Sequence, residues 1–179
     1  MQVVGFCGPS GVGKTTLIEG VIAGLKAQGL RVSVIKHAHQ QFDIDRPGKD
    51  SHRHRTAGAT EVLVASAQRL ALLREYDIAG LPTVHQLIAE LSPVDWVLLE
   101  GWKHAGVPKI EVWRAALGQA PLYPHDPFVT AVATDDPAAL PVPTQRPVLA
   151  LSPPAALVSL LLDTAARYCY HHQDAPRGA

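Results

Sequence analysis

The sequence has little cysteine, no net charge and no long apolar run. Its two cysteines, Cys7 and Cys169, are too few for a disulfide framework and do not have the spacing of a metal clip. The 16 basic side chains equal the 16 acidic ones, so no overall field attracts nucleic acid or a membrane surface. No apolar stretch approaches the roughly 18 residues that a membrane-spanning helix needs. These absences exclude a disulfide scaffold, a membrane protein and a globally basic nucleic-acid binder.

The first ten residues, MQVVGFCGPS, lack the basic start of a signal peptide. We therefore expect a cytoplasmic protein, in which Cys7 is a small buried hydrophobic residue. With 179 residues, the chain is long enough to bury the core of one domain. We expect a single domain over residues 1–170 and a frayed tail over residues 171–179.

Apolar runs alternate with helical patterns along the chain. Strands are predicted at 2–7, 31–35, 61–66, 69–75, 95–99, 109–114 (half-buried, from its alternation) and 128–134, with a short one in PVLAL. Helices are predicted between the glycine loop and Gly29, at 50–57, at 84–91 after Thr83, and from Ser152 to about Tyr170. The first strand, helix and second strand form a parallel βαβ unit. Only two residues separate 61–66 from 69–75, which predicts a β-hairpin.

A phosphate-binding loop lies between the first strand and the first helix. Gly8-Pro9-Ser10-Gly11-Val12-Gly13-Lys14-Thr15 matches G-x-x-x-x-G-K-[ST] at every fixed position and has the required strand before it and helix after it. Glycines let backbone N–H groups approach phosphate oxygens, and the helix dipole favours the negative charge. The predicted nucleotide-binding residues are Gly8, Ser10, Gly11, Val12, Gly13, Lys14, Thr15 and Thr16. The predicted fold is α/β, a P-loop NTPase-like three-layer fold with a mainly parallel sheet and an added β-hairpin.

Two residues are candidates for the metal side of this site. The Thr15 hydroxyl is a hard oxygen ligand suited to Mg²⁺. The hydrophobic strand VDWVLLEG ends in Glu100, and ligands gather at the carboxyl ends of strands in open α/β sheets. In phosphate-loop proteins an acid in this position lies near Mg²⁺, usually through water. The alternative for Glu100 is a solvated glutamate at the end of a strand.

The segment from Ile35 to Gly58 is rich in histidine, aspartate and basic residues. His37 and His39 with Asp43 could form a transition-metal site, although H-x-H spacing is weakly specific. The second interpretation is an anion or second-ligand loop, formed by His37, Lys49, Arg53 and Arg55. A purely solvated loop is the third. Asp43 and Asp45 are both candidates to approach Mg²⁺ or orient an attacking water, and Asp45 joins Glu100 as a catalytic candidate.

The chain resembles the molybdopterin-guanine dinucleotide biosynthesis protein B family. The resemblance rests on GPSGVGKTTL, VIKHAHQQFDIDRPGKDSHRHRTAGA, EVLVAS and LLEGWKHAGVPKIEVWR, which lie between residues 5 and 114. It implies a GTP-binding protein with weak hydrolysis, typically a homodimer, that assists the guanylyltransferase joining GMP to molybdopterin. By this resemblance the matching loop residues bind GTP phosphates and Glu100 takes the metal-side role. Family members often have a second histidine where this chain has Gln40.

The stretch ATDD (133–136) lies at a strand end where related folds read guanine. Asp135 could accept hydrogen bonds from the guanine N1–H and amine, although no N-K-x-D motif is present.

Two rival functions stand beside the accessory GTPase. One is a small-molecule kinase that binds ATP, with Arg53 and Arg55 in a lid. The other is a nucleotide-gated adaptor that dimerises through the apolar hairpin around Leu70, Leu72 and Leu73.

Overall fold

A computed structural model describes residues 1–38, 42–76, 80 and 82–171. The chain forms two compact units, one made of Met1–His37 with Thr83–Ala179 and the other of Ala38–Pro82. A single domain over residues 1–170 stays a prediction. Apart from His171, the predicted tail lies outside the described residues, as does His39. None of the helices in the described residues has the length and apolar character required to cross a membrane.

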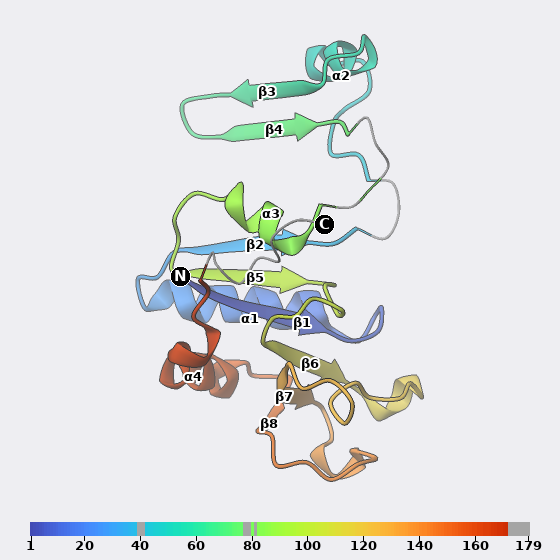
Figure 1. The fold of residues 1–179 in the computed structure, drawn as a ribbon, viewed down its shortest axis with the longest axis vertical. Helices are drawn as coiled ribbons and strands as arrows, with labels where there is room; N and C mark the ends of the chain where they lie inside the picture. The colour runs from blue at the N-terminus through green and yellow to red at the C-terminus, as the bar shows by residue number, and fades with distance from the viewer. Residues whose placement is uncertain (39–41, 77–79, 81, 172–179) are drawn as a thin grey trace. The chain divides into compact units, whose positions relative to one another are not determined.

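The first unit is built on a six-stranded parallel sheet (Figure 1). Its strands are β1 (Gln2–Cys7), β2 (Val32–Lys36), β5 (Trp96–Glu100), β6 (Lys109–Trp113), β7 (Val129–Thr134) and β8 (Val148–Ala150). They lie in the order β2-β5-β1-β6-β7-β8, and every neighbouring pair is parallel. The predicted α/β class is therefore confirmed. Because β5 lies beside β1, the acid at its end and the glycine loop reach the same edge of the sheet.

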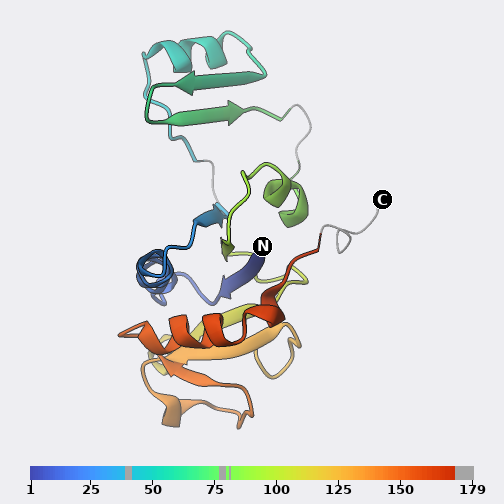
Figure 2. The same cartoon turned by 90° about the vertical axis from the view of Figure 1, so that its left-hand side faces the viewer.

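Helices cover both faces of this sheet. On one face, α1 (Lys14–Ala27) and α4 (Ala155–Asp163) pack on alternate residues of the central strands, such as Val4 and Leu98. On the other face, α3 (Val84–Ala89) packs on Val3 and Val97. Figure 2 shows α1 and α3 on opposite sides of β2 and β5. The three layers confirm the predicted architecture and leave the carboxyl ends of the strands for the loops.

Two helix predictions were tested closely by the structure. Thr83 caps α3 as expected: its side chain accepts from the Gln86 N–H, and the Gln86 side chain reaches back to the Thr83 N–H. The prediction of one final helix from Ser152 to Tyr170 is wrong. The helix α4 ends at Asp163, and the 3₁₀ turn η3 (Ala165–Tyr168) follows. The Thr164 hydroxyl donates to the Leu160 carbonyl at 2.6 Å beside the Thr164 N–H at 3.0 Å, a side-chain bond of the kind that bends helices.

Strand β6 is buried along its whole length, so the prediction of a half-buried strand at 109–114 is wrong. Ile110 and Val112 face the α1 side, as the alternation indicates. Lys109 and Glu111 point the other way, and each is only 1% exposed. The alternation identifies the polar face correctly, but connecting loops cover that face.

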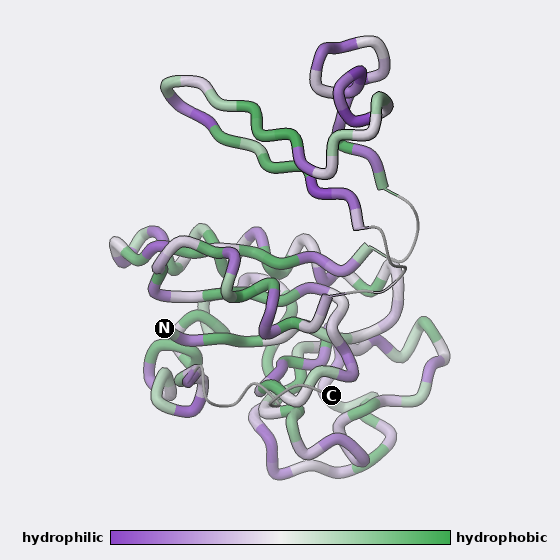
Figure 3. Tube along the Cα trace, turned by 45° about the horizontal axis from the view of Figure 1, so that its top comes forward, coloured by the Kyte–Doolittle hydropathy of each residue, from purple (hydrophilic) through white to green (hydrophobic). Residues whose placement is uncertain are grey.

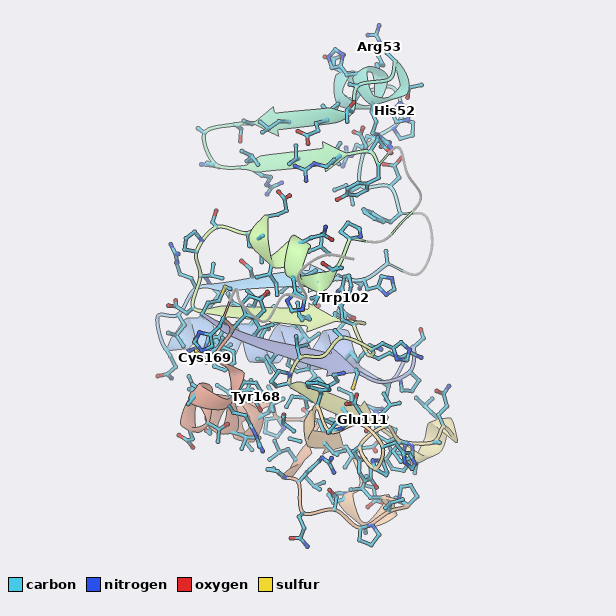
Figure 4. All side chains as sticks on the ribbon, in the orientation of Figure 1. His52, Arg53, Trp102, Glu111, Tyr168 and Cys169 are labelled. Atoms are coloured by element: carbon cyan, nitrogen blue, oxygen red, sulfur yellow. The ribbon has the colours of Figure 1, made fainter. Side chains whose placement is uncertain are left out.

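Those loops satisfy both buried charges. The Lys109 ammonium donates to the carbonyls of Lys103 and Ala105 and to Asp126 Oδ2 at 3.0 Å. Glu111, labelled in Figure 4, accepts from two backbone N–H groups of the 119–128 loop at 2.7 Å each. Burial still raises the pKa of the Glu111 carboxyl, although these donors lower it. Polar residues of β6 thus fix the loops above it.

The second unit contains α2 (Asp50–Thr56) and the antiparallel hairpin of β3 (Glu61–Ala65) and β4 (Leu70–Arg74). The predicted short helix and hairpin are confirmed. The connection is a four-residue turn closed by the Ser66 side chain, which accepts from the N–H groups of Gln68 and Arg69. Figure 3 shows apolar residues along both strands. In this unit the hairpin's large apolar side chains are mostly exposed: Leu63 59%, Val64 48%, Leu70 64% and Leu72 40%.

Candidate functional site

The glycine loop turns sharply between β1 and α1. Gly8 and Gly13 have φ values of 134° and 103°, a region that side-chain-bearing residues rarely adopt. A Cβ on Gly8 would also lie 2.2 Å from the Val112 carbonyl oxygen of the neighbouring strand. Gly13 then caps the start of α1 without any side-chain bond. The loop conformation therefore requires glycine and leaves the first backbone donors of α1 for a ligand.

Lys14 folds back over this loop. Its ammonium donates to the carbonyls of Gly8 and Pro9 at 2.9 and 2.7 Å. Burial lowers the pKa of Lys14, and the Glu100 carboxylate partly offsets the effect. A phosphate group offers stronger, charged acceptors than two carbonyls. The side chain is thus preorganised above the loop where phosphates would bind.

Thr15 and Glu100 meet across the edge of the sheet. The Thr15 hydroxyl donates to Glu100 Oε1 at 2.7 Å. The other carboxylate oxygen lies 3.5 Å from the ammonium of Lys36, the last residue of β2. Glu100 is only 8% exposed, so it is held between these partners and is not a solvated glutamate at a strand end.

A hydroxyl and a carboxylate in contact are a fitting pair of oxygen donors for Mg²⁺, which keeps several waters of its own. Because both side chains are already fixed, no rearrangement of the backbone is needed to present them. The donor set at this edge therefore fits the expected magnesium, for which Thr15 would be the direct ligand with Glu100 beside it.

His37 lies on the same edge, in the first unit. Its N–H donates to the Glu100 carbonyl at 2.9 Å, extending β2 by one bond. Its ring lies 5.2 Å from that of Trp102, which is labelled in Figure 4. Trp102 follows Gly101, where a Cβ would meet His37 at 3.3 Å. The histidine and tryptophan thus form an aromatic pair beside Glu100.

The transition-metal interpretation gains no support from the described residues. His39 is outside them, and His37 and Asp43 belong to different units. Within the described ranges, no group of three or more His, Cys, Asp or Glu side chains gathers as metal ligands would.

Other residues predicted for the second ligand belong to the second unit. Arg55 lies against three carboxylates there: Asp43 at 2.7 Å, Glu75 at 2.9 Å and Asp45 at 3.6 Å. Asp45, the second catalytic candidate, also accepts from the Ser51 hydroxyl at 2.8 Å and from the Arg46 N–H. These contacts tie the loop before α2 to the hairpin. Within this unit, Arg55 and Asp45 already act as a structural clamp.

Lys49 and Arg53 are both exposed, at the start of α2 and within it. Arg53 extends from the surface of the helix (Figure 4) and lies 3.7 Å from Asp50, an exposed pair of little energetic weight. These two cations, unlike Arg55, are available to an anion.

Asp135 lies beyond β7 and pairs with a residue that the sequence analysis missed. The Arg114 Nε lies 3.5 Å from Asp135 Oδ2. Arg114 immediately follows β6, at the same edge of the sheet as the glycine loop. A basic residue directly after a buried strand is the signal that could have found it, by the rule already applied to Glu100.

Comparison with known proteins places these features in a family. Residues 3–135 match the family described as Molybdopterin guanine dinucleotide synthesis protein B. The matched range contains the glycine loop, the hairpin, Glu100 and the Arg114–Asp135 pair.

Two curated relatives agree with this match. The chain is 41% identical over 140 residues to the molybdopterin-guanine dinucleotide biosynthesis adapter protein of Escherichia coli, an alignment that covers 76% of this chain and 80% of the relative. It is 40% identical over 140 residues to the protein of the same name from Haemophilus influenzae, with 76% of each chain covered.

Solved structures show the same fold. A MobB protein homolog from Bacillus stearothermophilus aligns with a TM-score of 0.65 at 27% identity, covering 91% of this chain and 97% of that one. Bacillus subtilis MobB aligns with a TM-score of 0.71 at 24% identity, covering 96% and 100%.

Proposed function

The chain belongs to the molybdopterin guanine dinucleotide synthesis protein B family, and from this premise we propose that it is a GTP-binding accessory protein with weak GTPase activity. It acts in molybdenum cofactor biosynthesis, in the conversion of molybdopterin to its guanine dinucleotide form. The relatives are named adapters, which favours this role over that of a small-molecule kinase.

The contact between Thr15 and Glu100 carries the proposal. A glycine loop alone could bind many anions, but a loop threonine bonded at 2.7 Å to a strand-end carboxylate is suited to a metal-bound polyphosphate. Lys14 supplies the charge for the β- and γ-phosphates, and the N–H groups of the loop and the Thr16 hydroxyl supply neutral donors. Mg²⁺, when bound, neutralises the charge between these phosphates.

Weak hydrolysis follows from what the site supplies for the attacking water. No arginine finger or positioning glutamine is evident in the sequence, so turnover is slow. Asp45 stays the candidate for orienting water, together with Glu100. Asp45→Asn tests this role: it should lower turnover while GTP affinity is retained, and unchanged turnover would remove Asp45 from the mechanism.

Guanine selectivity is proposed for the segment after β7, in which Asp135, 48% exposed, is one candidate to read the base. The product of the pathway contains guanine, which favours GTP over ATP as the ligand. His37, Lys49 and Arg53 remain proposed contacts for a second anionic ligand.

The protein is proposed to work as a cytoplasmic homodimer that assists the guanylyltransferase of the pathway. The second unit favours dimerisation because its exposed apolar residues are too many for an isolated surface. They are Phe42, Ile44, Leu63, Val64, Leu70, Leu72 and Tyr76.

Calorimetric titration with GTP and ATP in the presence of Mg²⁺ tests the proposal. We expect GTP to bind more tightly than ATP, with slow release of phosphate and no phosphorylation in a screen of small metabolites. Preferential ATP binding, or phosphate transfer to a metabolite, would replace the accessory role with the kinase. The adapter role is tested separately by measuring whether the purified chain binds the pathway's guanylyltransferase, with and without GTP.

A further inference from the structure

Arg114 lies against the glycine loop although it is not part of the loop motif. Its guanidinium Nη2 is 3.4 Å from the position that a Cβ on Gly13 would take. Gly13 is the capping residue of α1, so the guanidinium stands beside the loop at the start of the helix. An arginine keeps its charge at every physiological pH and offers a planar set of donors that matches phosphate. Arg114 is therefore in a position to contact an anion bound at the glycine loop.

The only carboxylate paired with Arg114 in the part of the chain that the structure describes is Asp135. Their closest atoms, Nε and Oδ2, are 3.5 Å apart, and the Nε is buried without a hydrogen bond. The two side chains are 40% and 48% exposed. Asp135 thus orients the guanidinium electrostatically through the buried Nε, which leaves the Nη donors for a ligand.

The order of the strands decides which part of a nucleotide Arg114 would meet. Glu100 ends β5 on one flank of the loop, and Arg114 follows β6 on the other. A triphosphate whose metal-binding end lies beside Thr15 and Glu100 must run away from β5 along the loop. Its α-phosphate and nucleoside are then directed toward β6 and β7. Arg114 is therefore on the α-phosphate side of the site.

We propose that Arg114 is a nucleotide-contacting residue that binds the α-phosphate end of the ligand, and that Asp135 is the residue that positions it. The inference rests on the proposed function, because it requires a nucleotide on the loop. It also gives Asp135 a role different from guanine reading: a carboxylate that holds Arg114 affects every nucleotide alike, whereas one that accepts from guanine affects guanine nucleotides only.

Arg114→Ala tests the contact by calorimetry with GTP and GDP at fixed Mg²⁺. One charge-assisted hydrogen bond corresponds to about tenfold to hundredfold in affinity. We expect that loss for GTP and GDP by the same factor, since both carry the α-phosphate. Arg114→Lys keeps the positive charge but lacks the planar set of guanidinium donors, so its affinity should lie between those of the wild type and Arg114→Ala. Arg167→Ala is the matched control, because exposed Arg167 lies in η3, which leads to the bridge between Cys169 and Gln2 at the opposite end of β1.

Asp135→Ala separates positioning from guanine reading. If Asp135 positions Arg114, the variant loses affinity for GTP and inosine triphosphate equally, and adds nothing to Arg114→Ala in the double variant. If Asp135 reads guanine, GTP binding weakens more than inosine triphosphate binding, because inosine keeps the N1–H but lacks the exocyclic amine, and the loss adds to that of Arg114→Ala. The second pattern would overturn the positioning role.

Lys14→Ala separates this inference from the proposed function. If the wild-type protein binds no GTP, the proposed function fails. If Lys14→Ala abolishes binding while folded Arg114→Ala binds GTP and GDP as the wild type does, the function stands and the inference is wrong. Circular dichroism and thermal unfolding establish the folded state. Should Arg114→Ala not fold, the test uses Arg114→Lys and Asp135→Ala. Affinity losses that are equal for GTP and GDP in these variants support the α-phosphate contact, and unchanged or unequal affinities contradict it.

Discussion

The Thr15 hydroxyl donates a 2.7 Å hydrogen bond to Glu100, a residue 85 positions away in the sequence. The bond joins the first turn of α1 to the end of β5, two elements that reach one edge because β5 pairs with β1 in parallel. The proposed metal ligand Thr15 and its acidic neighbour are thus brought together by sheet order, not by proximity in the sequence.

Glu100→Gln should weaken GTP binding in the presence of Mg²⁺ and leave GTP binding without Mg²⁺ unchanged. Glutamine still accepts from Thr15 but has no charge to attract Mg²⁺, so GTP affinity with Mg²⁺ should fall about tenfold. Affinity in excess chelator should stay the same, as measured by calorimetry. Asp163→Asn at the end of α4 is a control for the loss of one carboxylate. An equal loss with and without Mg²⁺ would contradict the metal-side role.

The pH dependence of GTP binding should follow Lys14. Burial lowers its folded pKa below the ordinary 10.5, while bound phosphates favour the charged form. Affinity is therefore greatest below the folded pKa and declines as pH rises through it. Calorimetry between about pH 7 and about pH 10 should show this decline together with proton uptake on binding. In Lys14→Arg the guanidinium does not deprotonate, so this contribution to the pH dependence of GTP affinity should be lost. The contribution from titration of the guanine base is the same for both proteins and should remain. Identical profiles for the two would exclude Lys14 as the titrating group.

Asp126→Ala should destabilise the first unit without touching the nucleotide site. The change leaves the Lys109 ammonium, 1% exposed, without the carboxylate at 3.0 Å. Breaking a buried ion pair by removing one partner costs about 3 kcal/mol or more in the free energy of unfolding. Chemical denaturation measures this, and a loss below about 1 kcal/mol, typical of exposed pairs, would show that the two carbonyl acceptors suffice. GTP affinity of the folded fraction should be unchanged.

Leu72→Glu should weaken self-association. Leu72 lies opposite Leu63 in the hairpin register, and the two leucines share an exposed face. A charge there is costly to bury in an interface. Light scattering at micromolar concentration should give a dimer for the wild type and the mass of one chain, 19.2 kDa, for the variant. Leu117→Glu, equally 40% exposed but in the first unit, should remain dimeric. A monomeric wild type would remove the hairpin interface altogether.

Much of the fold could be predicted because its signals are local. The glycine loop, the strand that ends in Glu100 and the cap at Thr83 each depend on a few neighbouring residues. The burial of Lys109 could not be predicted, because it depends on loops that return from elsewhere in the chain to cover a polar face. Arg114 follows the same strand-end rule as Glu100, but only the strand order places it beside Gly13. The contacts of Arg55 likewise come from residues on both sides of α2 in the sequence.

The most direct test of the account is a titration of GTP into the wild-type protein and Lys14→Ala in the presence of Mg²⁺. The Lys14 ammonium donates to two loop carbonyls and lies outside the hydrophobic core, so the variant should keep the wild-type unfolding temperature. We predict that the wild type binds GTP and that the variant binds it about 100-fold more weakly, the loss expected for a charge-assisted phosphate contact. Equal affinities in the two proteins, or no binding by the wild type, would contradict the account.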